Sequence, residues 1–194
     1  MRAFPKILQI LGLTLLLIAP ADRAWPDFDA GLLAYEHGDY KTAYEQWRPA
    51  AEKGDPYAQH MLGFLYANGR GVPLQPEQTV LWWRRAAEQG FAPAQYTLGS
   101  LYRQGMGVKR DLEQAAKWIG RAADAGYPDA QYTYGVMHAT GEGVEADLSA
   151  AYMWLDLAAD TKGLEPGTFW KNIDKLLTPM QRLEADQLKK TWGK

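Results

Sequence analysis

The chain is dominated by a sequence unit that returns every 36 residues. A glutamine, a tryptophan, a valine and several glycines keep this step: Gln59, Gln95 and Gln131; Trp82, Trp118 and Trp154; Val72, Val108 and Val144; Gly63, Gly99 and Gly135; Gly69, Gly105 and Gly141; Gly71, Gly107 and Gly143. Self-similarity at a fixed period of this length is typical of arrays in which each unit stacks on its neighbours. The repeat therefore predicts a stacked array.

Turn and cap residues divide each unit into two helices of about 12 and 15 residues. Asp55-Pro56 is a cap residue followed by proline at the first helical position, and Gly69 stands where a left-handed residue ends that helix. Asp111 followed three residues later by Gln114 is a capping-box pattern for a second helix. No sustained alternation or β-branched run indicates a strand. The sequence predicts an all-α fold of antiparallel helix pairs.

The two ends of the array depart from the pattern. A shorter first pair is expected around the turn Gly38-Asp39-Tyr40, with helices at about 27–37 and 40–53. After the last unit we expect a helix at about 168–177. A final helix then starts at Thr178-Pro179-Met180-Gln181, another capping-box pattern. We expect the repeat array in residues 22–162 and a C-terminal helical cap in residues 163–194.

The first 21 residues have the pattern of a secretory signal peptide. Arg2 and Lys6 precede a largely apolar stretch at 7–18, and Ala19-Pro20-Ala21 fits a small-x-small cleavage site. The apolar stretch is shorter than the roughly 20 residues that span a bilayer. We expect an exported, soluble mature protein, periplasmic or secreted, without stable membrane insertion. An uncleaved anchor is the alternative.

The repeated units resemble the Sel-1-like repeat, a relative of the tetratricopeptide repeat. The resemblance is carried by A-Q-H-M-L-G-F-L-Y-A-N-G-R-G-V and its two equivalents, at residues 58–72, 94–108 and 130–144, and by the W-x-x-x-A-A endings. It covers about Asp27 to Asp160. It implies a right-handed α/α superhelical solenoid of about four helix-pair repeats plus capping helices. It also implies a non-enzymatic scaffold or adaptor, often exported in bacteria.

Residues suited to catalysis or metal binding are sparse. The chain has no cysteine, which excludes disulfides and thiol chemistry, and its net charge of -2 does not favour nucleic acid binding. Ser100 and Ser149 lack the flanking motifs of serine nucleophiles. The G-x-G loops follow no strand and lack a third glycine, so we interpret them as turns and not as phosphate cradles. We expect no catalytic residue, no metal site and no cofactor.

Two sets of repeated residues favour packing roles. Trp82, Trp118 and Trp154 occupy the same phase of each second helix, beside small residues such as Ala86, and are expected in the core. Gly63 and its equivalents lie in the middle of helices despite a cost of about 1 kcal/mol, which predicts close approach of a neighbouring helix.

A comparison of the units separates two faces of each first helix. At 100° per residue, positions that stay alike fall between about 140° and 300°, and positions that change fall between about 340° and 100°. The resemblance to superhelical arrays places the varying side on the concave surface, where extended partners bind. The varying residues proposed to bind a partner are His60, Phe64 and Asn68; Tyr96, Ser100, Arg103 and Gln104; and Tyr132, Val136 and Thr140.

These residues predict a groove that binds a protein or peptide, because aromatic and arginine side chains are frequent anchors at interfaces. A solvated face without a partner is the plain alternative. Two further functions stay open. One is a cell-envelope enzyme or binder acting on peptidoglycan-like or β-lactam ligands. The other is a structural module of a larger envelope complex. The sequence does not identify the partner.

Overall fold

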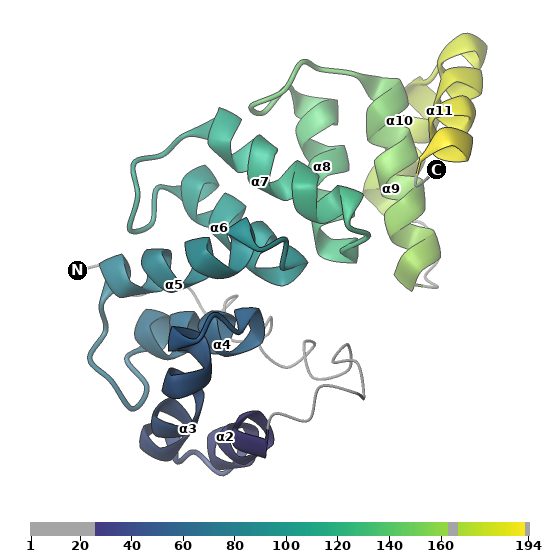
Figure 1. Ribbon diagram of the computed structural model, residues 1–194. Coiled ribbons are helices and arrows are strands. Elements are labelled where there is room, and N and C mark those ends of the chain that lie inside the picture. Colours follow the sequence, from purple (N-terminus) through teal and green to yellow (C-terminus); the bar gives the residue numbers. More distant parts are fainter. Residues whose placement is uncertain (1–25, 163–166, 193–194) are drawn as a thin grey trace. The chain divides into compact units, whose positions relative to one another are not determined.

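The computed structural model describes residues 26–162 and 167–192, which form ten helices and no strand (Figure 1). The chain divides into two compact units. One contains the described residues up to Ala94 together with Met106–Val108, and the other contains Gln95–Gly105 and the described residues from Lys109 onward. The signal peptide expected at residues 1–21 lies outside the described residues.

The first unit contains two complete helix pairs. They are α2 (Pro26–Glu36) with α3 (Tyr40–Glu52), and α4 (Pro56–Asn68) with α5 (Pro76–Glu88). Each helix packs on the next one along the chain. As expected from the sequence, the Asp55 carboxylate accepts a 2.7 Å hydrogen bond from the amide of Ala58, and Gly69 ends α4 with a φ of 62°. A left-handed residue at this position favours glycine.

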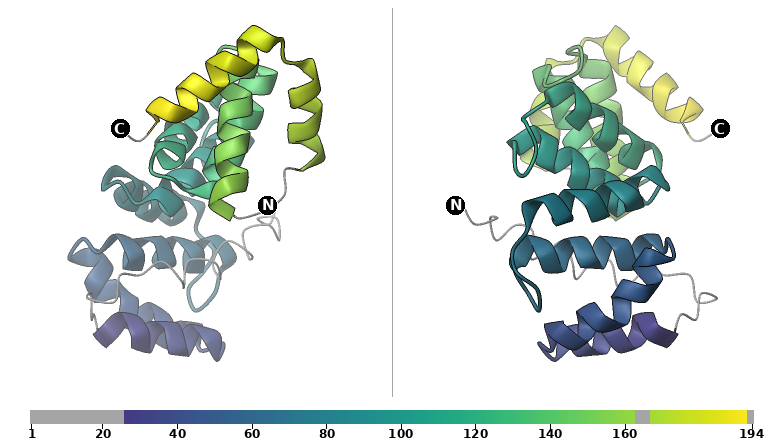
Figure 2. Two further views of the ribbon diagram at one scale, coloured as in Figure 1. Left: turned by 90° about the vertical axis from the view of Figure 1, so that its right-hand side faces the viewer. Right: turned by 60° about the vertical axis from the view of Figure 1, so that its left-hand side comes forward.

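The second unit holds most of α6 (Ala92–Gln104), followed by α7 (Leu112–Asp124), α8 (Pro128–Thr140) and α9 (Leu148–Lys162). It ends in α10 (Thr168–Leu176) and α11 (Pro179–Thr191), which both pack on α9 (Figure 2). The capping box predicted at Thr178 and Gln181 is present at the start of α11. The bounds of both cap helices agree with the sequence prediction to within one or two residues.

The mid-helix glycines lie where a large side chain of the paired helix approaches, as the sequence predicted. A Cβ on Gly63 would overlap the indole of Trp83, and a Cβ on Gly31 would overlap that of Trp47. In the later repeats the approaching residues are Ile119 at Gly99 and Leu155 at Gly135. The approaching positions 47, 83, 119 and 155 are spaced by 36 residues, and all four side chains are buried. The glycine therefore sets how closely the two helices of a pair approach.

The repeated glutamine ties successive pairs together. The Gln59 side-chain amide donates to the carbonyl of Ala51, at 3.0 Å, and Gln131 makes the equivalent bond to Ala123, at 3.5 Å. In both cases the acceptor is near the end of the preceding second helix. Both glutamines are buried, where a polar side chain without a partner would be costly. The repeated glutamine thus adds a side-chain hydrogen bond from a first helix to the second helix before it.

Candidate interaction surface

The varying side chains of the second unit lie on α6 and α8. They stand mostly three or four residues apart along each helix, which places them on one side of it. We call this set the α6–α8 face: Tyr96, Ser100, Arg103 and Gln104 on α6, and Tyr132, Val136 and Thr140 on α8.

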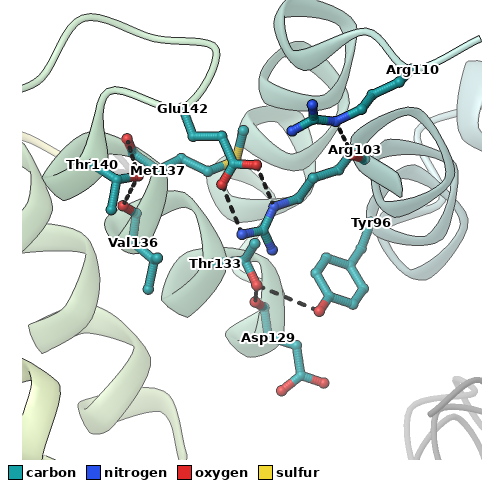
Figure 3. A network of polar contacts seen from close by, with 9 residues as sticks. All are labelled: Tyr96, Arg103, Arg110, Asp129, Thr133, Val136, Met137, Thr140 and Glu142. Carbon is teal, nitrogen blue, oxygen red and sulfur yellow. Dashed lines mark hydrogen bonds and ion pairs between the residues drawn. The ribbon is translucent and has the colours of Figure 1, made fainter. Parts of the chain in front are cut away.

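Two polar contacts join α6 to the α8 segment (Figure 3). Near the start of α8, the hydroxyls of Tyr96 and Thr133 lie 3.4 Å apart. Beyond the end of α8, Arg103 donates to both oxygens of Glu142, from Nε at 3.1 Å and from Nη2 at 2.8 Å. A bidentate arginine–carboxylate pair fixes the orientation of the two side chains as well as pairing their charges. Ser100 and Val136, both small, occupy the helices between these two contacts.

A second arginine lies at the same end of the face. Arg110 donates from Nε to the carbonyl oxygen of Arg103, at 3.1 Å, and its charge also acts on Glu142. The hydrogen bond from Arg103, supported by both positive charges, lowers the pKa of the Glu142 carboxyl. This end of the face therefore holds two guanidinium groups around one ionised carboxylate (Figure 3).

Solvent reaches the α6–α8 face. Tyr132 is 46% exposed although it is a large aromatic residue, and Gln104 and Thr140 are exposed as well. The remaining members are half-buried. The Arg103 side chain keeps 36% of its surface accessible. Exposed aromatic and arginine side chains on one face are typical of protein contact surfaces.

The structure corrects the prediction for the first repeat. His60 and Phe64 were expected on an open face, but they are 1% and 2% exposed. Their rings pack against each other and against the indole of Trp83, and His60 also contacts Phe91. Asn68 is half-buried, and its amide donates to the carbonyl of Phe64. In this repeat the varying residues therefore build an aromatic core.

The tryptophans Trp82, Trp118 and Trp154 are buried, as predicted. Two of them are covered by an arginine three residues later: the guanidinium carbons of Arg85 and Arg121 each lie 4.8 Å from the ring centre. These arginines belong to second helices and are exposed, so Arg121 on α7 offers a control position that is not part of the α6–α8 face.

The serines make ordinary hydrogen bonds. The Ser100 hydroxyl donates to the carbonyl of Tyr96 in its own helix, and buried Ser149 donates to the Glu184 carboxylate at 2.9 Å. In the part of the chain that the structure describes, no cluster of three histidine or acidic side chains is arranged to hold a metal ion. No helix there is long and apolar enough to cross a membrane.

The sequence analysis missed Thr133, Arg110 and Glu142. The signal for Glu142 was present, because the middle residue of the G-x-G loop changes from Arg70 to Met106 to Glu142 while the glycines stay fixed. The same residue of the first loop, Arg70, stacks on Tyr40 with its guanidinium carbon 4.8 Å from the ring centre. In both loops this varying residue contacts an earlier helix of its own unit.

The repeated helix pair of this chain is also found in known proteins. A family model described as Sel1 repeat matches residues 56–91, 92–127 and 128–160, together more than half of the chain. The crystal structure of a Sel1 repeat protein from Oxalobacter formigenes is 31% identical over 69% of this chain and 55% of that chain, with a TM-score of 0.67. A protective antigen of uropathogenic Escherichia coli strains, which displays an SLR fold, is 30% identical over 86% of this chain and 44% of that chain, with a TM-score of 0.57. The chain spans about half the length of these solved structures. No curated protein matches it.

Paired helices, a periodic core and a repeated glutamine tie define an all-helical repeat protein of the α/α solenoid class. The chain belongs to the Sel1 repeat family, whose members are generally protein-interaction scaffolds without catalytic function. The first pair, α2 and α3, lies outside the residues that the family model matches.

Proposed function

We propose that this protein is an exported, non-enzymatic adaptor that binds a protein or peptide partner on the α6–α8 face. The observation that carries the proposal is the contrast between two sets of side chains. The glutamines and mid-helix glycines kept alike between repeats are buried where helices pack on one another; they include Gln59, Gln131, Gly63, Gly99 and Gly135. The residues that vary on α6 and α8 remain accessible, with Tyr132 as a large exposed aromatic side chain.

Binding on this face requires no chemical step. Affinity would come from covering Tyr132 and Val136 and from pairing the polar groups around them. Area alone does not set affinity, because ordering side chains and removing water from polar groups oppose binding. An already fixed arginine such as Arg103 lowers that ordering cost, since Glu142 holds its guanidinium in place.

Affinity purification from cells tests the binding proposal. We expect a partner to co-purify with the wild-type protein and to be lost with Tyr132→Ala, because truncation removes an exposed aromatic anchor. The matched control is Arg121→Ala on α7. Equal recovery of the partner with both variants would contradict binding on the α6–α8 face.

Export is a separate part of the proposal and has its own test. It is supported by the basic, apolar and small-residue order of residues 1–21. Cell fractionation followed by intact mass measurement should find an exported product that begins at Asp22. A cytoplasmic product that retains Met1 or Arg2 would contradict it.

A further inference from the structure

The guanidinium pair at one end of the α6–α8 face carries more positive charge than its single carboxylate neutralises. Arg103 and Arg110 are the charged side chains that act on Glu142, and Glu142 is the acidic residue that acts on Arg103. Two nearby acids cap helices: Asp111 accepts from the amide of Gln114 in α7, and Asp147 accepts from the amides of Ser149 and Ala150 in α9. The cluster of Arg103, Arg110 and Glu142 therefore holds two guanidinium groups and one carboxylate.

Several N–H groups of the two arginines make no hydrogen bond within the described residues. A guanidinium has five N–H donors in a planar fork. Arg103 uses Nε and Nη2 on Glu142, and Arg110 uses Nε on a carbonyl oxygen. Within the described residues, the Nη1 group of Arg103 and both terminal nitrogens of Arg110 have no hydrogen-bond partner. Arg110 is exposed, so its terminal nitrogens are accessible to solvent, and the half-buried Arg103 side chain keeps 36% of its surface accessible.

The fold does not require either arginine. The positions equivalent to Arg103 are Ala67 and Ala139, and those equivalent to Arg110 are Leu74 and Ala146. In all three repeats the Cβ atom of the residue at the Arg110 position packs over the glycine that ends the first helix. A Cβ built on that glycine would lie 3.3 Å from the Cβ of Leu74, 3.1 Å from that of Arg110 and 3.5 Å from that of Ala146. The loop therefore needs only a Cβ there. Both arginines are therefore present in only one of the three repeats.

We propose that Arg103 and Arg110 together bind a carboxylate of the protein partner, an aspartate, a glutamate or a chain end, while Tyr132 and Val136 contact the apolar residues beside it. The inference rests on the proposed function of the α6–α8 face and adds the chemistry of the partner. Arginine suits this role because its planar fork matches a carboxylate with two parallel hydrogen bonds.

A peptide selection tests the inference. A phage-displayed library of random 12-residue peptides is selected on the purified protein, and binding of an enriched peptide is measured by fluorescence anisotropy. We expect enriched peptides to contain an acidic residue beside an aromatic or aliphatic one. Replacing that acid by its amide should weaken binding about tenfold, and Arg103→Gln and Arg110→Gln should each do the same. The amide replacement should have little further effect on binding to either variant. Arg121→Gln on α7 should bind like the wild type.

Glu142→Gln separates binding from folding. If the Arg103–Glu142 pair only holds α6 to α8, Glu142→Gln and Arg103→Gln should weaken peptide binding equally. If Arg103 binds the partner's carboxylate, Glu142→Gln should retain or tighten binding, because it removes a competing negative charge. Thermal unfolding of each variant shows that the comparison is made between folded proteins.

The outcomes distinguish the two proposals. Peptides that lose binding with Tyr132→Ala but show no preference for acids, and no response to Arg103→Gln or Arg110→Gln, would overturn the carboxylate assignment and leave the proposed function standing. Equal weakening by Glu142→Gln and Arg103→Gln would also overturn the assignment. Recovery of no peptide that responds to Tyr132→Ala would overturn both.

Discussion

The indole Nε1 of Trp83 donates a 3.0 Å hydrogen bond to the backbone carbonyl of His60, and the same indole fills the space above Gly63. The pair before it repeats the arrangement, with Trp47 donating to Phe28 at 3.1 Å above Gly31. In both pairs a glycine beneath the ring lets the tryptophan come close enough to donate its N–H to the helix backbone. The mid-helix glycine and the large residue opposite it thus pack as a pair that holds the two helices close together.

Gly63→Ala tests this packing. The new methyl group would overlap the Trp83 ring, which is fully buried. We expect a loss of about 1–3 kcal/mol in the free energy of unfolding, because overpacking a close-packed core forces strain. Chemical denaturation measures it. Gly167→Ala is the control, since a Cβ there meets nothing within 4 Å, and it should cost less than about 1 kcal/mol. Equal losses in the two variants would contradict the packing argument.

His60 should make the protein sensitive to acid. Burial lowers the pKa of this histidine from 6.5 to about 3. The unfolded chain therefore binds a proton below pH 6.5 that the folded chain does not bind until about pH 3. Stability should fall as the pH drops through this window, by an amount on the order of a few kcal/mol. His60→Leu should reduce the fall, because leucine does not titrate.

The measurement is the free energy of unfolding of wild type and His60→Leu at several pH values from 7 to 4. The difference between the two proteins removes the contribution of carboxylates such as Glu142, whose depressed pKa also reduces stability in acid. A difference that stays constant with pH would show that His60 is not buried as a neutral side chain.

The cap helix α11 should depend on one small buried residue. Ala185 is 1% exposed, while Lys189 beside it lies 2.5 Å from Asp156 and 2.6 Å from Asp160 on α9. Ala185→Glu should place an unpaired charge in this contact and release α11, seen as faster amide hydrogen exchange in residues 179–191. Leu183→Glu on the exposed side of α11 is the matched control and should leave exchange unchanged. Exchange that increases equally in both variants would mean that α11 is not held through Ala185.

Much of the fold followed from the sequence because its signals are local. A helix end needs a cap, and a close approach of two helices needs a residue without a side chain. Each need is met by a few residue types at one position, as at Thr178, Asp55, Gly69 and the mid-helix glycines. The burial of His60 and Phe64 was not predictable in the same way. The residue that covers them, Trp83, is replaced by Ile119 and Leu155 in later repeats, so a search for residues that stay identical between units did not single it out.

The α6–α8 face was predicted only in part for a related reason. A comparison of units shows which positions vary, and it therefore found Tyr96, Arg103 and Tyr132. It does not show which side chains from different units meet. The pairing of Arg103 with Glu142 joins residues 39 positions apart, and depends on how the loop after α8 lies against α6.

Site-specific photo-crosslinking in cells tests the central claim that the α6–α8 face binds a protein partner. The photoreactive residue replaces Tyr132, or Arg121 on α7 as the control, and mass spectrometry identifies the adducts. We predict one dominant protein adduct at Tyr132 that is absent at Arg121. Adducts only at Arg121, or at neither position, would contradict the claim.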